Sequence, residues 1–385
     1  MDYKRLGNYI REVNVRNLDL KVTNLLGVSI SKEFMPSIAN TIGTDMSSYK
    51  IVERGLFAYG PVTSRNGDKV SIALLDGYEN AIISQAYTVF EVTDHEQLLP
   101  KYLMMWFRRP EFDRYARFHS HGSAREIFDW DELCDIMLPI PSIARQREIV
   151  SEYEMLTNRI RLNNQMIQPL ETTAQALYRK TFVDNIDKEN LPKGWRMGTI
   201  GEFCEVITKG TTPSTYNEEG RVNFVKAETI LPEHCIEKKM LAHIDENIHC
   251  NELKRSIVKE NDILFTIAGT LGKFCIVDKS ILPANTNQAV AIIRIDESKV
   301  YPIDIYAMFV GGAHEDYCKR NIQQAVQANL SLETISRLPI VLPPNDMMNM
   351  FHNHVAPVFH SIYLKQQEIS KLTELQSLLL AKMGQ

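Results

Sequence analysis

The residues best suited to contact a polyanion form two polar runs in the second half of the chain. The run KGTTPS at 209–214 joins a cation and hydroxyl groups to a glycine. Backbone amides and hydroxyls of this kind hold phosphate oxygens without reading base sequence. The run ANTNQ at 284–288, matched by ISQ at 83–85, supplies amide side chains that can pair with adenine in the major groove. Ordinary turn formation explains the same residue types, so both interpretations stay open.

A basic and aromatic segment lies in the first half of the chain. Five arginines fall within eighteen residues and alternate with aromatic side chains. This pattern fits a helix with an aromatic core face and a solvated basic face, and it also fits phosphate contact. The arginines are Arg108, Arg109, Arg114, Arg117 and Arg125.

Signatures of catalysis are absent from the sequence. It contains no G-x-S-x-G, H-E-x-x-H or Rossmann glycine pattern. The run GTLGK at 269–273 imitates a phosphate-binding loop, but its glycines are too close together and Phe274 replaces the magnesium-binding hydroxyl residue. We therefore expect a tight turn between two strands there. The histidines and cysteines lack zinc-site spacing. The sequence predicts no catalytic residues, no metal and no cofactor on this chain.

Composition indicates a globular protein of two or three domains. The chain has 385 residues, of which 44% are hydrophobic and 24% charged. No apolar run approaches the ~20 residues of a membrane span, and no apolar signal core follows the N-terminus. Six scattered cysteines favour reduced thiols, so we expect a cytoplasmic protein. The net charge of −5 means that any DNA contact must use locally concentrated positive charge or charge from partners.

The elements that would position these residues occur twice, because the sequence contains an internal repeat. A shift of 202 residues superposes the two halves, so that Tyr153 falls on Val355 and Pro141 falls on Pro343. With small gaps, the SQA run at 84–86 also aligns with the NQA run at 287–289. A period this long is not a solenoid. It predicts two similar domains and a molecule with internal two-fold symmetry that recognises something two-sided.

Each copy ends in a long amphipathic helix, expected at about 144–180 and about 346–383. Apolar residues alternate spacings of four and three, which is the seam of a coiled coil. Antiparallel pairing would bring Asn163 and Lys365 together as a buried polar layer, whereas two helices lying separately on their own domains is the alternative. Pro169 and Pro357 should each kink or restart a helix. The predicted interface residues are Ile149, Tyr153, Leu156, Ile160, Asn163, Ile167, Leu170 and Leu177 in the first helix, and Phe351, Val355, Val358, Ile362, Lys365, Ile369, Leu372 and Leu379 in the second.

Four blocks follow from these patterns. Short β-branched and aromatic runs, such as 69–75, 87–92, 222–225, 262–267 and 289–295, predict strands in both mixed blocks. A helical stretch is expected at about 101–117, and a polar linker at 181–190. The expected domains are 1–141, the first long helix at 142–182, the linker with the second mixed block at 183–341, and the second long helix at 342–385.

Taken together, these features resemble the specificity subunit of type I restriction–modification systems, and the resemblance covers essentially the whole chain. The first half lacks the Gly-Trp opening of the second and has YGPVT at 59–63 where the second has TIAGT at 266–270. The second helix begins with NDMM in place of ARQR. The matching runs are LPKGW at 191–195, IGE at 200–202, KGTTPS at 209–214, NDILFTIAGTLGK at 261–273, NQA at 287–289 and LPIPSIARQREI at 138–149.

The resemblance implies an α+β chain in which two similar α/β target recognition domains are joined by two long antiparallel helices with pseudo-two-fold symmetry. Each domain would read half of an interrupted sequence in double-stranded DNA, and helix length would set the spacing. The chain itself would be non-catalytic. Partner methyltransferase subunits, two in number, would carry S-adenosylmethionine, and restriction subunits, where present, would use ATP and magnesium.

Residue type and resemblance together predict a set of DNA-contacting side chains in both halves. Two other classes of function stay open. The chain could be a coiled-coil scaffold with duplicated interaction domains and no DNA binding, or an enzyme with unrecognised motifs. The predicted DNA-contacting residues are Ser64, Arg65, Asn66, Lys69, Ser84, Gln85, Lys209, Thr211, Thr212, Ser214, Lys226, Thr270, Lys273, Asn287 and Gln288.

Overall fold

The fold was analysed in a computed structural model that describes residues 3–37, 43–64, 66–67, 69–122, 126–184, 186–322 and 328–384. The chain divides into two compact units. Unit 1 consists of residues 1–163 and 367–385, and unit 2 consists of residues 164–366. Two long helices, α4 (Ile143–Phe182) and α8 (Asn345–Lys382), each contribute one part to each unit. Both lie within about two residues of the bounds predicted from the heptads.

Unit 1 is built around a four-stranded antiparallel sheet. One face, carrying Phe57 and Phe90, packs against Phe107 of the first helix of the unit, with ring centroids of Phe57 and Phe107 5.9 Å apart. The other face, carrying Ala58 and Val89, packs against two strand pairs that form an outer layer. The central sheet has the order β2 (Ile10–Val13), β9 (Thr88–Val92), β6 (Phe57–Tyr59) and β7 (Ile72–Leu74), and the outer pairs are β3 (Leu26–Val28) with β4 (Phe34–Pro36) and β5 (Lys50–Glu53) with β8 (Asn80–Ile83).

Unit 2 repeats this layering. Ile263 and Phe265 on one face of its central sheet pack against α5 (Pro302–Val310), while Leu264 and Ile292 on the other face meet the outer sheet. The central sheet has the order β12 (Cys204–Lys209), β19 (Val290–Ile295), β16 (Ile263–Thr266) and β17 (Phe274–Ile276). The outer sheet has the order β14 (Ala242–Ile244), β13 (Val222–Val225), β18 (Ala284–Thr286) and β15 (Ile257–Val258), with β13 and β18 parallel.

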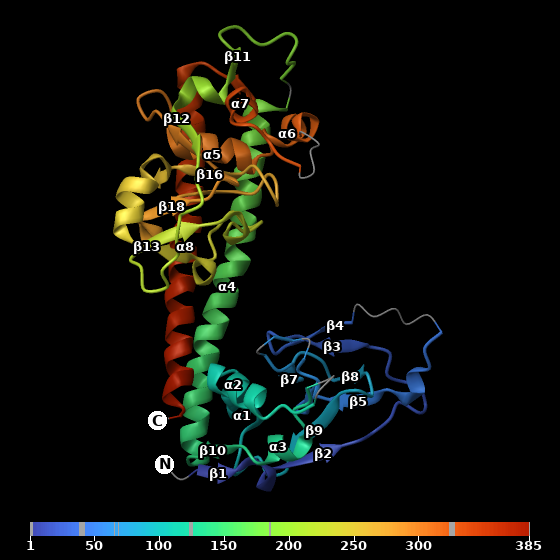
Figure 1. Cartoon of the computed structure of the whole chain (residues 1–385). Coiled ribbons are helices and arrows are strands. Elements are labelled where there is room, and N and C mark those ends of the chain that lie inside the picture. The colour runs from blue at the N-terminus through green and yellow to red at the C-terminus, as the bar shows by residue number, and fades with distance from the viewer. Residues whose placement is uncertain are drawn as a thin grey trace. The chain divides into compact units, whose positions relative to one another are not determined.

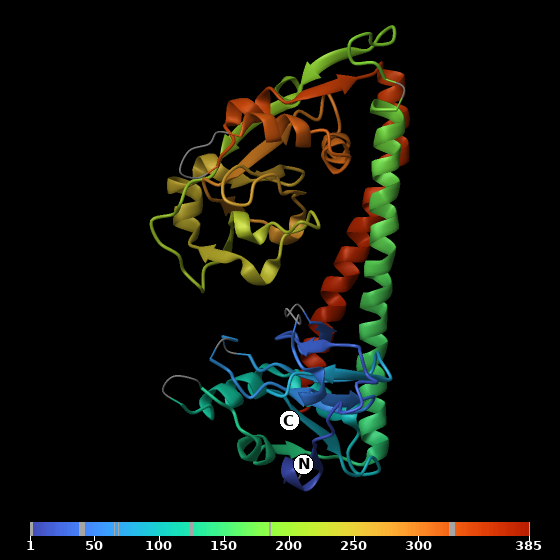
Figure 2. The same ribbon diagram turned by 90° about the vertical axis from the view of Figure 1, so that its right-hand side faces the viewer.

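The correspondence between the units extends to the strand pairs that precede the long helices, which are visible in Figures 1 and 2. In each unit an early strand pairs antiparallel with the strand before a long helix. Among the described residues, each unit also carries three short α-helices in the same chain order. The pairs are β1 (Tyr3–Arg5) with β10 (Met137–Pro139) and β11 (Arg196–Thr199) with β20 (Pro339–Leu342), and the helices are α1 (Pro100–Phe107), α2 (Pro110–Phe118), α3 (Trp130–Cys134), α5, α6 (Glu315–Asn321) and α7 (Leu332–Ser336).

The helical stretch predicted at about 101–117 is confirmed, and the structure divides it into two helices, α1 and α2. Pro110 begins α2, and the residue before it, Arg109, is extended with φ −70° and ψ 138°. A residue preceding proline is sterically driven out of the helical region, so the chain must turn at this point.

The two prolines inside the long helices do not end them. Pro169 lies within α4 and Pro357 within α8. The hydroxyl of Thr173 donates to the Pro169 carbonyl at 2.8 Å, and the hydroxyl of Ser361 donates to the Pro357 carbonyl at 2.9 Å. The expected restart is therefore absent, because each helix continues on both sides of its proline.

Within each unit the two long helices pack against each other. In unit 1, Tyr153 of α4 shares a hydrophobic cluster with Leu380 of α8, and the amide of Gln376 donates to the Thr157 hydroxyl at 2.7 Å. In unit 2, Phe182 of α4 packs edge-on against Phe351 of α8, with ring centroids 4.9 Å apart. The early part of one helix meets the late part of the other in both cases, so the pairing is antiparallel. Among the described residues, neither these helices nor any other has the length and apolar character to cross a membrane.

Candidate nucleic-acid interface

The predicted polar runs of unit 2 lie against each other at one end of the sheets. The loop that follows β12 packs on the loop that follows β18, and the Thr211 amide donates to the Thr286 carbonyl at 3.1 Å. At Gly210 a Cβ atom would lie 1.7 Å from the Thr286 carbonyl oxygen. Only glycine allows the two backbones to approach so closely. The glycine of the KGTTPS run is therefore a packing requirement, which its position in sequence could not reveal.

Several predicted side chains meet at this end of unit 2. The Thr212 hydroxyl lies 2.5 Å from Oε1 of Gln288, and the Asn287 side-chain oxygen accepts from the Ala289 amide at 3.2 Å. The Asn287 amide donates to the carbonyl of Val225, the residue before Lys226. The ammonium of Lys226 lies 5.0 Å from the ring centroid of the half-exposed Tyr216. The exposed residues Lys209 and Thr211 border the same loops. Cations, hydroxyls and amides are thus gathered on one exposed surface, which we call the unit 2 loop surface.

Ser214 is engaged differently from its neighbours. Its backbone amide and its hydroxyl each bind an oxygen of Glu252 at 2.7 Å. A carboxylate at this place repels phosphate. In this arrangement Ser214 fixes the loop to the η6 turn (Ile248–Glu252) and offers no free donor to a phosphate group.

Thr270 and Lys273 belong to the turn between β16 and β17. Thr266 organises this turn, since its hydroxyl accepts from the Lys273 amide at 2.9 Å and donates to the Thr270 carbonyl. Gly269 and Gly272 adopt positive φ of 74° and 82°. The predicted tight turn between two strands is confirmed. Among the described residues, the side chains of Thr270 and Lys273 form no hydrogen bond or ion pair with the unit 2 loop surface, although the Ile267 amide donates to the Ala289 carbonyl at 2.8 Å.

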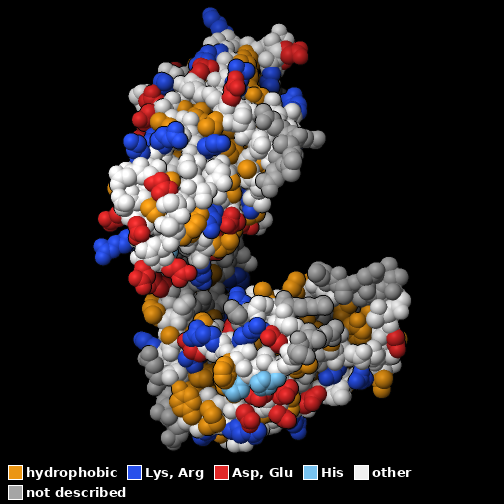
Figure 3. All heavy atoms as spheres, in the orientation of Figure 1, with side chains coloured by type: hydrophobic (Ala, Val, Ile, Leu, Met, Phe, Trp, Pro, Cys, Tyr) orange, Lys and Arg blue, Asp and Glu red, His pale blue; other side chains and the backbone are white. Residues whose placement is uncertain are grey.

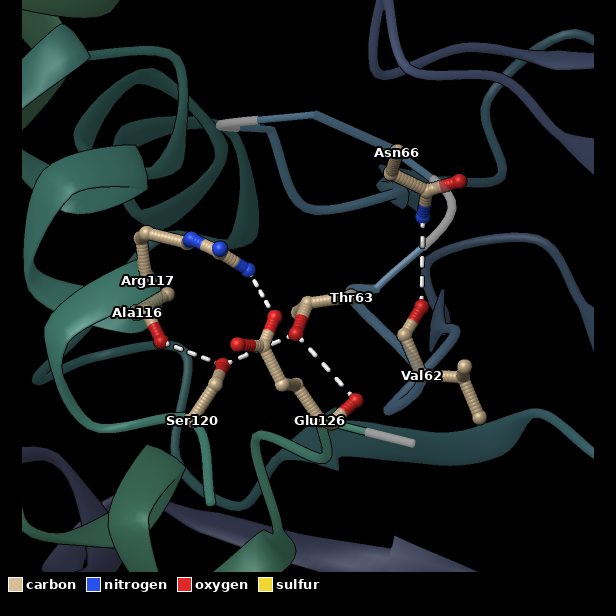
Figure 4. Close-up of polar contacts among 7 residues, drawn as sticks. All are labelled: Val62, Thr63, Asn66, Ala116, Arg117, Ser120 and Glu126. Carbon is tan, nitrogen blue, oxygen red and sulfur yellow. Dashed lines mark hydrogen bonds and ion pairs between the residues drawn. The ribbon is translucent and has the colours of Figure 1, made fainter. Parts of the chain in front are cut away.

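The corresponding turn of unit 1, between β6 and β7, is held against the end of α2 (Figure 4). The Thr63 hydroxyl lies 3.0 Å from the Ser120 hydroxyl and 3.2 Å from the Glu126 carbonyl, and the Asn66 amide nitrogen donates to the Val62 carbonyl at 3.3 Å. Ser64 and Lys69 are exposed on this turn, while Arg65 lies outside the described residues.

The second polar run of unit 1 lies beside an arginine that sequence reasoning missed. Gln85 is exposed and Ser84 half-buried. Nη1 of Arg16 donates to the Ser48 carbonyl at 2.6 Å and lies 3.4 Å from Oε1 of Gln85. Arg16 lies in the loop that follows β2, and the repeat places this loop at the same point of the fold as the KGTTPS run after β12. This correspondence is the sequence signal that points to Arg16.

Three arginines of the basic and aromatic segment, Arg109, Arg114 and Arg117, make contacts within unit 1. The guanidinium of Arg109, which is 7% exposed, stacks 4.2 Å from the Trp106 ring. Arg114 pairs with Glu111 at 3.3 Å, and Arg117 pairs with Glu126. Arg125 lies outside the described residues. These contacts favour the structural interpretation of the segment. Basic and acidic side chains are likewise interspersed on the face drawn in Figure 3, in keeping with the net charge of −5.

The predicted helix seam is buried to different degrees. Asn163 is 0% exposed, and among the described residues neither atom of its amide has a hydrogen-bond partner. Its meeting with Lys365 stays a prediction. Near the end of α8 the buried residues are Leu380 and Met383, whereas Leu379 is only half-buried. Tyr153, Phe351, Val355 and Ile362 are buried, and the half-buried seam residues are Ile149, Leu156, Ile160, Ile167, Leu170, Leu177, Val358, Lys365, Ile369 and Leu372.

A buried glutamine missed by the heptad analysis ties the start of α4 to unit 1. Gln146 is 0% exposed. Its Oε1 accepts from the Leu99 amide at 2.9 Å, and its Nε2 donates to the carbonyls of Gln97 at 2.8 Å and Pro141 at 2.9 Å. The repeat places Met348 at the matching position of α8, so this anchor belongs to unit 1 alone.

Two buried histidines of unit 2 add no positive charge at neutral pH. A cavity of about 320 Å³ beside the β16–β17 turn is lined by His234 and His314. Burial lowers the pKa of His314 to about 4 and also lowers the pKa of His234, so both rings are neutral. Within the described ranges, no group of three or more His, Cys, Asp or Glu side chains is arranged to hold a metal ion.

Comparison with known proteins identifies the class of this fold. Residues 192–373 match the family model described as the type I restriction modification DNA specificity domain. The MjaIX type I restriction enzyme specificity subunit of Methanocaldococcus jannaschii is 23% identical over 307 residues, covering 74% of this chain and 68% of that protein. The HindI specificity subunit of Haemophilus influenzae is 20% identical, covering 90% of this chain and 89% of that protein.

A solved structure has the same fold. The crystal structure of the type I restriction–modification S subunit from M. genitalium covers all of this chain and 96% of its own, with a TM-score of 0.59 at 13% identity. The resemblance predicted from sequence is therefore confirmed. Residues 192–373 match the DNA specificity domain of type I restriction–modification systems, and the chain is similar over most of its length to type I specificity subunits.

Proposed function

We propose that this chain is the non-catalytic subunit that recognises an interrupted target in double-stranded DNA, with one half-site read by each unit. The observation that carries the proposal is the repeated placement of polar loops. In both units, exposed glutamine and cationic or hydroxyl residues extend from the same ends of equivalent strands, Gln85 near Arg16 and Gln288 near Thr212. A two-part reader needs two such surfaces.

The long helices provide the second part of the proposal. They would set the number of unread base pairs between the half-sites and would dock methyltransferase subunits. Exposed apolar side chains on α4 and α8 support docking, because large apolar side chains on a helix face favour association with another apolar surface. Leu162 and Leu364 occupy the same position of the repeat, and both are about half exposed at 45% and 52%.

The chemistry would then be performed by the partners. Methyltransferase subunits would bind S-adenosylmethionine and modify adenine, and restriction subunits, where present, would use ATP and magnesium. Partner subunits would also supply positive charge around the DNA, since this chain carries a net charge of −5.

The test is co-purification of the chain with its genomic neighbours, followed by mapping of methylated sites in the host genome. We expect one interrupted motif whose two halves change independently when either unit is exchanged. DNA affinity should also fall steeply as salt rises, since each neutralised phosphate releases a counterion. Binding to partners without any salt-dependent DNA affinity would instead favour a scaffold. Methylation by the isolated chain would contradict a non-catalytic role.

A further inference from the structure

In each unit an exposed glutamine accepts a hydrogen bond at its Oε1 atom. The donor in each unit is the third residue after an equivalent strand. Gln85 is the second residue after β8 and Arg16 the third after β2, with Nη1 of Arg16 3.4 Å from Oε1 of Gln85. Gln288 is the second residue after β18 and Thr212 the third after β12, with the Thr212 hydroxyl 2.5 Å from Oε1 of Gln288. Two unlike side chains therefore make one shared contact.

In unit 1 this contact fixes which end of the amide faces outward. A guanidinium has only donors, so its neighbour must be the amide oxygen and cannot be the amide nitrogen. The Nε2 group of Gln85 is consequently directed away from Arg16. In the part of the chain that the structure describes, no group accepts a hydrogen bond from Nε2 of Gln85, and both residues are exposed.

Among the described residues, no carboxylate pairs with the guanidinium of Arg16. Arg11, on β2, pairs with Glu91 at 2.5 Å, and Arg54 pairs with Glu79 at 3.0 Å. For Arg16 the partners among the described residues are the Ser48 carbonyl and Gln85, and neither is a carboxylate. The pair of Arg16 and Gln85 thus presents hydrogen-bond donors and a positive charge to whatever approaches it.

Such a pair suits one kind of base edge. Bidentate recognition of adenine by glutamine needs the amide oxygen to accept from N6 while the amide nitrogen donates to N7. Arg16 donates to Oε1 of Gln85 and engages one lone pair of that oxygen, so the group that Gln85 directs away from Arg16 is the Nε2 donor. The major-groove edge of guanine carries two acceptors, N7 and O6, and no donor.

We propose that Gln85, positioned by Arg16, donates from Nε2 to a purine N7 in the half-site of unit 1, with guanine preferred over adenine. Gln288 and Thr212 are the counterpart for the other half-site. This inference rests on the proposed function and adds to it the chemical group that is read and the residue that orients the reader.

The experiment first enriches duplexes from a randomised library with the full chain as it purifies from its host. Each purine of the enriched site is then replaced in turn by its 7-deaza analogue, which lacks the N7 acceptor. Wild-type protein should lose roughly tenfold in affinity at one purine of one half-site, the size expected for a single base contact. At that position guanine should be favoured over adenine.

Three variants separate reading from folding. Gln85→Glu keeps the shape and the contact with Arg16 but cannot donate, so it should bind the natural site about tenfold more weakly and become insensitive to the 7-deaza purine. Arg16→Met should relax the preference for guanine by freeing Oε1, whereas Arg16→Lys should preserve salt-dependent affinity. The matched control Gln288→Glu should shift sensitivity in the other half-site only, and unchanged reading of one half-site reports an intact fold.

The outcomes distinguish failure of the proposed function from failure of the donor assignment to Gln85. If no sequence is enriched, the proposed function fails. If a site is enriched but Gln85→Glu keeps the 7-deaza sensitivity of wild type, or no N7 matters in either half-site, the donor assignment is overturned. The donor assignment is supported if Gln85→Glu loses its sensitivity to 7-deaza substitution at one purine and keeps it at the others.

Discussion

Asp304 shows how burial alters a single residue of unit 2. It lies on α5, is 2% exposed, and has its carboxyl 2.9 Å from Nδ1 of His352 on α8. Burial raises the pKa of Asp304 from 3.8 to about 6, although the hydrogen bond from His352 opposes the increase. A carboxyl with a raised pKa binds its proton more tightly in the folded protein than in the unfolded chain.

The sign of the pH dependence follows. The stabilising contribution of Asp304 is complete below pH 3.8 and is lost as the pH rises through about 6. From pH 4 to pH 7, the free energy of unfolding of wild type should therefore fall by about 1–3 kcal/mol more than that of Asp304→Asn. Urea denaturation at each pH measures the difference. The exposed Asp316→Asn serves as the control, and parallel curves for wild type and Asp304→Asn would contradict the prediction.

Lys209 allows a residue-scale test of phosphate contact. It is exposed at the end of β12, and among the described residues it forms no ion pair with a carboxylate. Replacing Lys209 by Gln should weaken binding to all DNA sequences equally and reduce the slope of log affinity against log salt by about 0.9. Fluorescence titrations at several salt concentrations test this. Lys238→Gln, an exposed position in a different loop, should leave the slope unchanged, whereas a sequence-dependent effect of Lys209→Gln would argue for base contact.

At the scale of elements, long periodic patterns were predictable and short ones were not. The heptads located α4 and α8 because many residues repeat one spacing, and the strand predicted at 222–225 has the bounds of β13. The β3–β4 pair was missed, since strands of three residues interrupted by Gly27 or ended by Pro36 show no alternation. Pairing across such a hairpin depends on contacts with distant segments, here the cluster around Val52.

Asn163 gives a prediction about the helix pair. A buried amide without hydrogen bonds costs about 1–3 kcal/mol, so Asn163→Leu should raise the free energy of unfolding by about that amount. Thermal and urea unfolding measure the change, and Asn164→Leu, at the neighbouring exposed position, should change stability little. If Asn163→Leu destabilises the protein instead, the amide has a partner in solution, and the predicted meeting with Lys365 becomes the first contact to examine.

At the scale of the whole molecule, the internal repeat predicted two similar domains, and each unit indeed has a four-stranded sheet with equivalent strand order. The arrangement of the candidate interface was only partly predictable. Residue types identified Gln85 and Gln288, whereas Arg16 and Glu252 entered only when folding brought distant loops together. A single sequence does not record which loop lies beside which.

The proposed role of the helices leads to a measurable length. Deleting residues 160–166 from α4 together with residues 362–368 from α8 removes seven residues from each, or about 10 Å of helix. At about 3.4 Å per base pair, the preferred spacer should shorten by about three base pairs while both half-sites stay the same. Mapping of methylated sites measures this. Deletion from one helix alone should abolish activity through loss of register, and an unchanged spacer in the double deletion would refute the role.

The two units also differ in when they can be completed during synthesis. Unit 2 is a continuous stretch of chain, whereas the core of unit 1 includes Leu380 and Met383, which pack with Val150 and Tyr153. Unit 2 is therefore synthesised in full before residues 367–385, which complete the core of unit 1, are added. The half translated first is the half finished last, and until then its apolar face is open to chaperones and proteases.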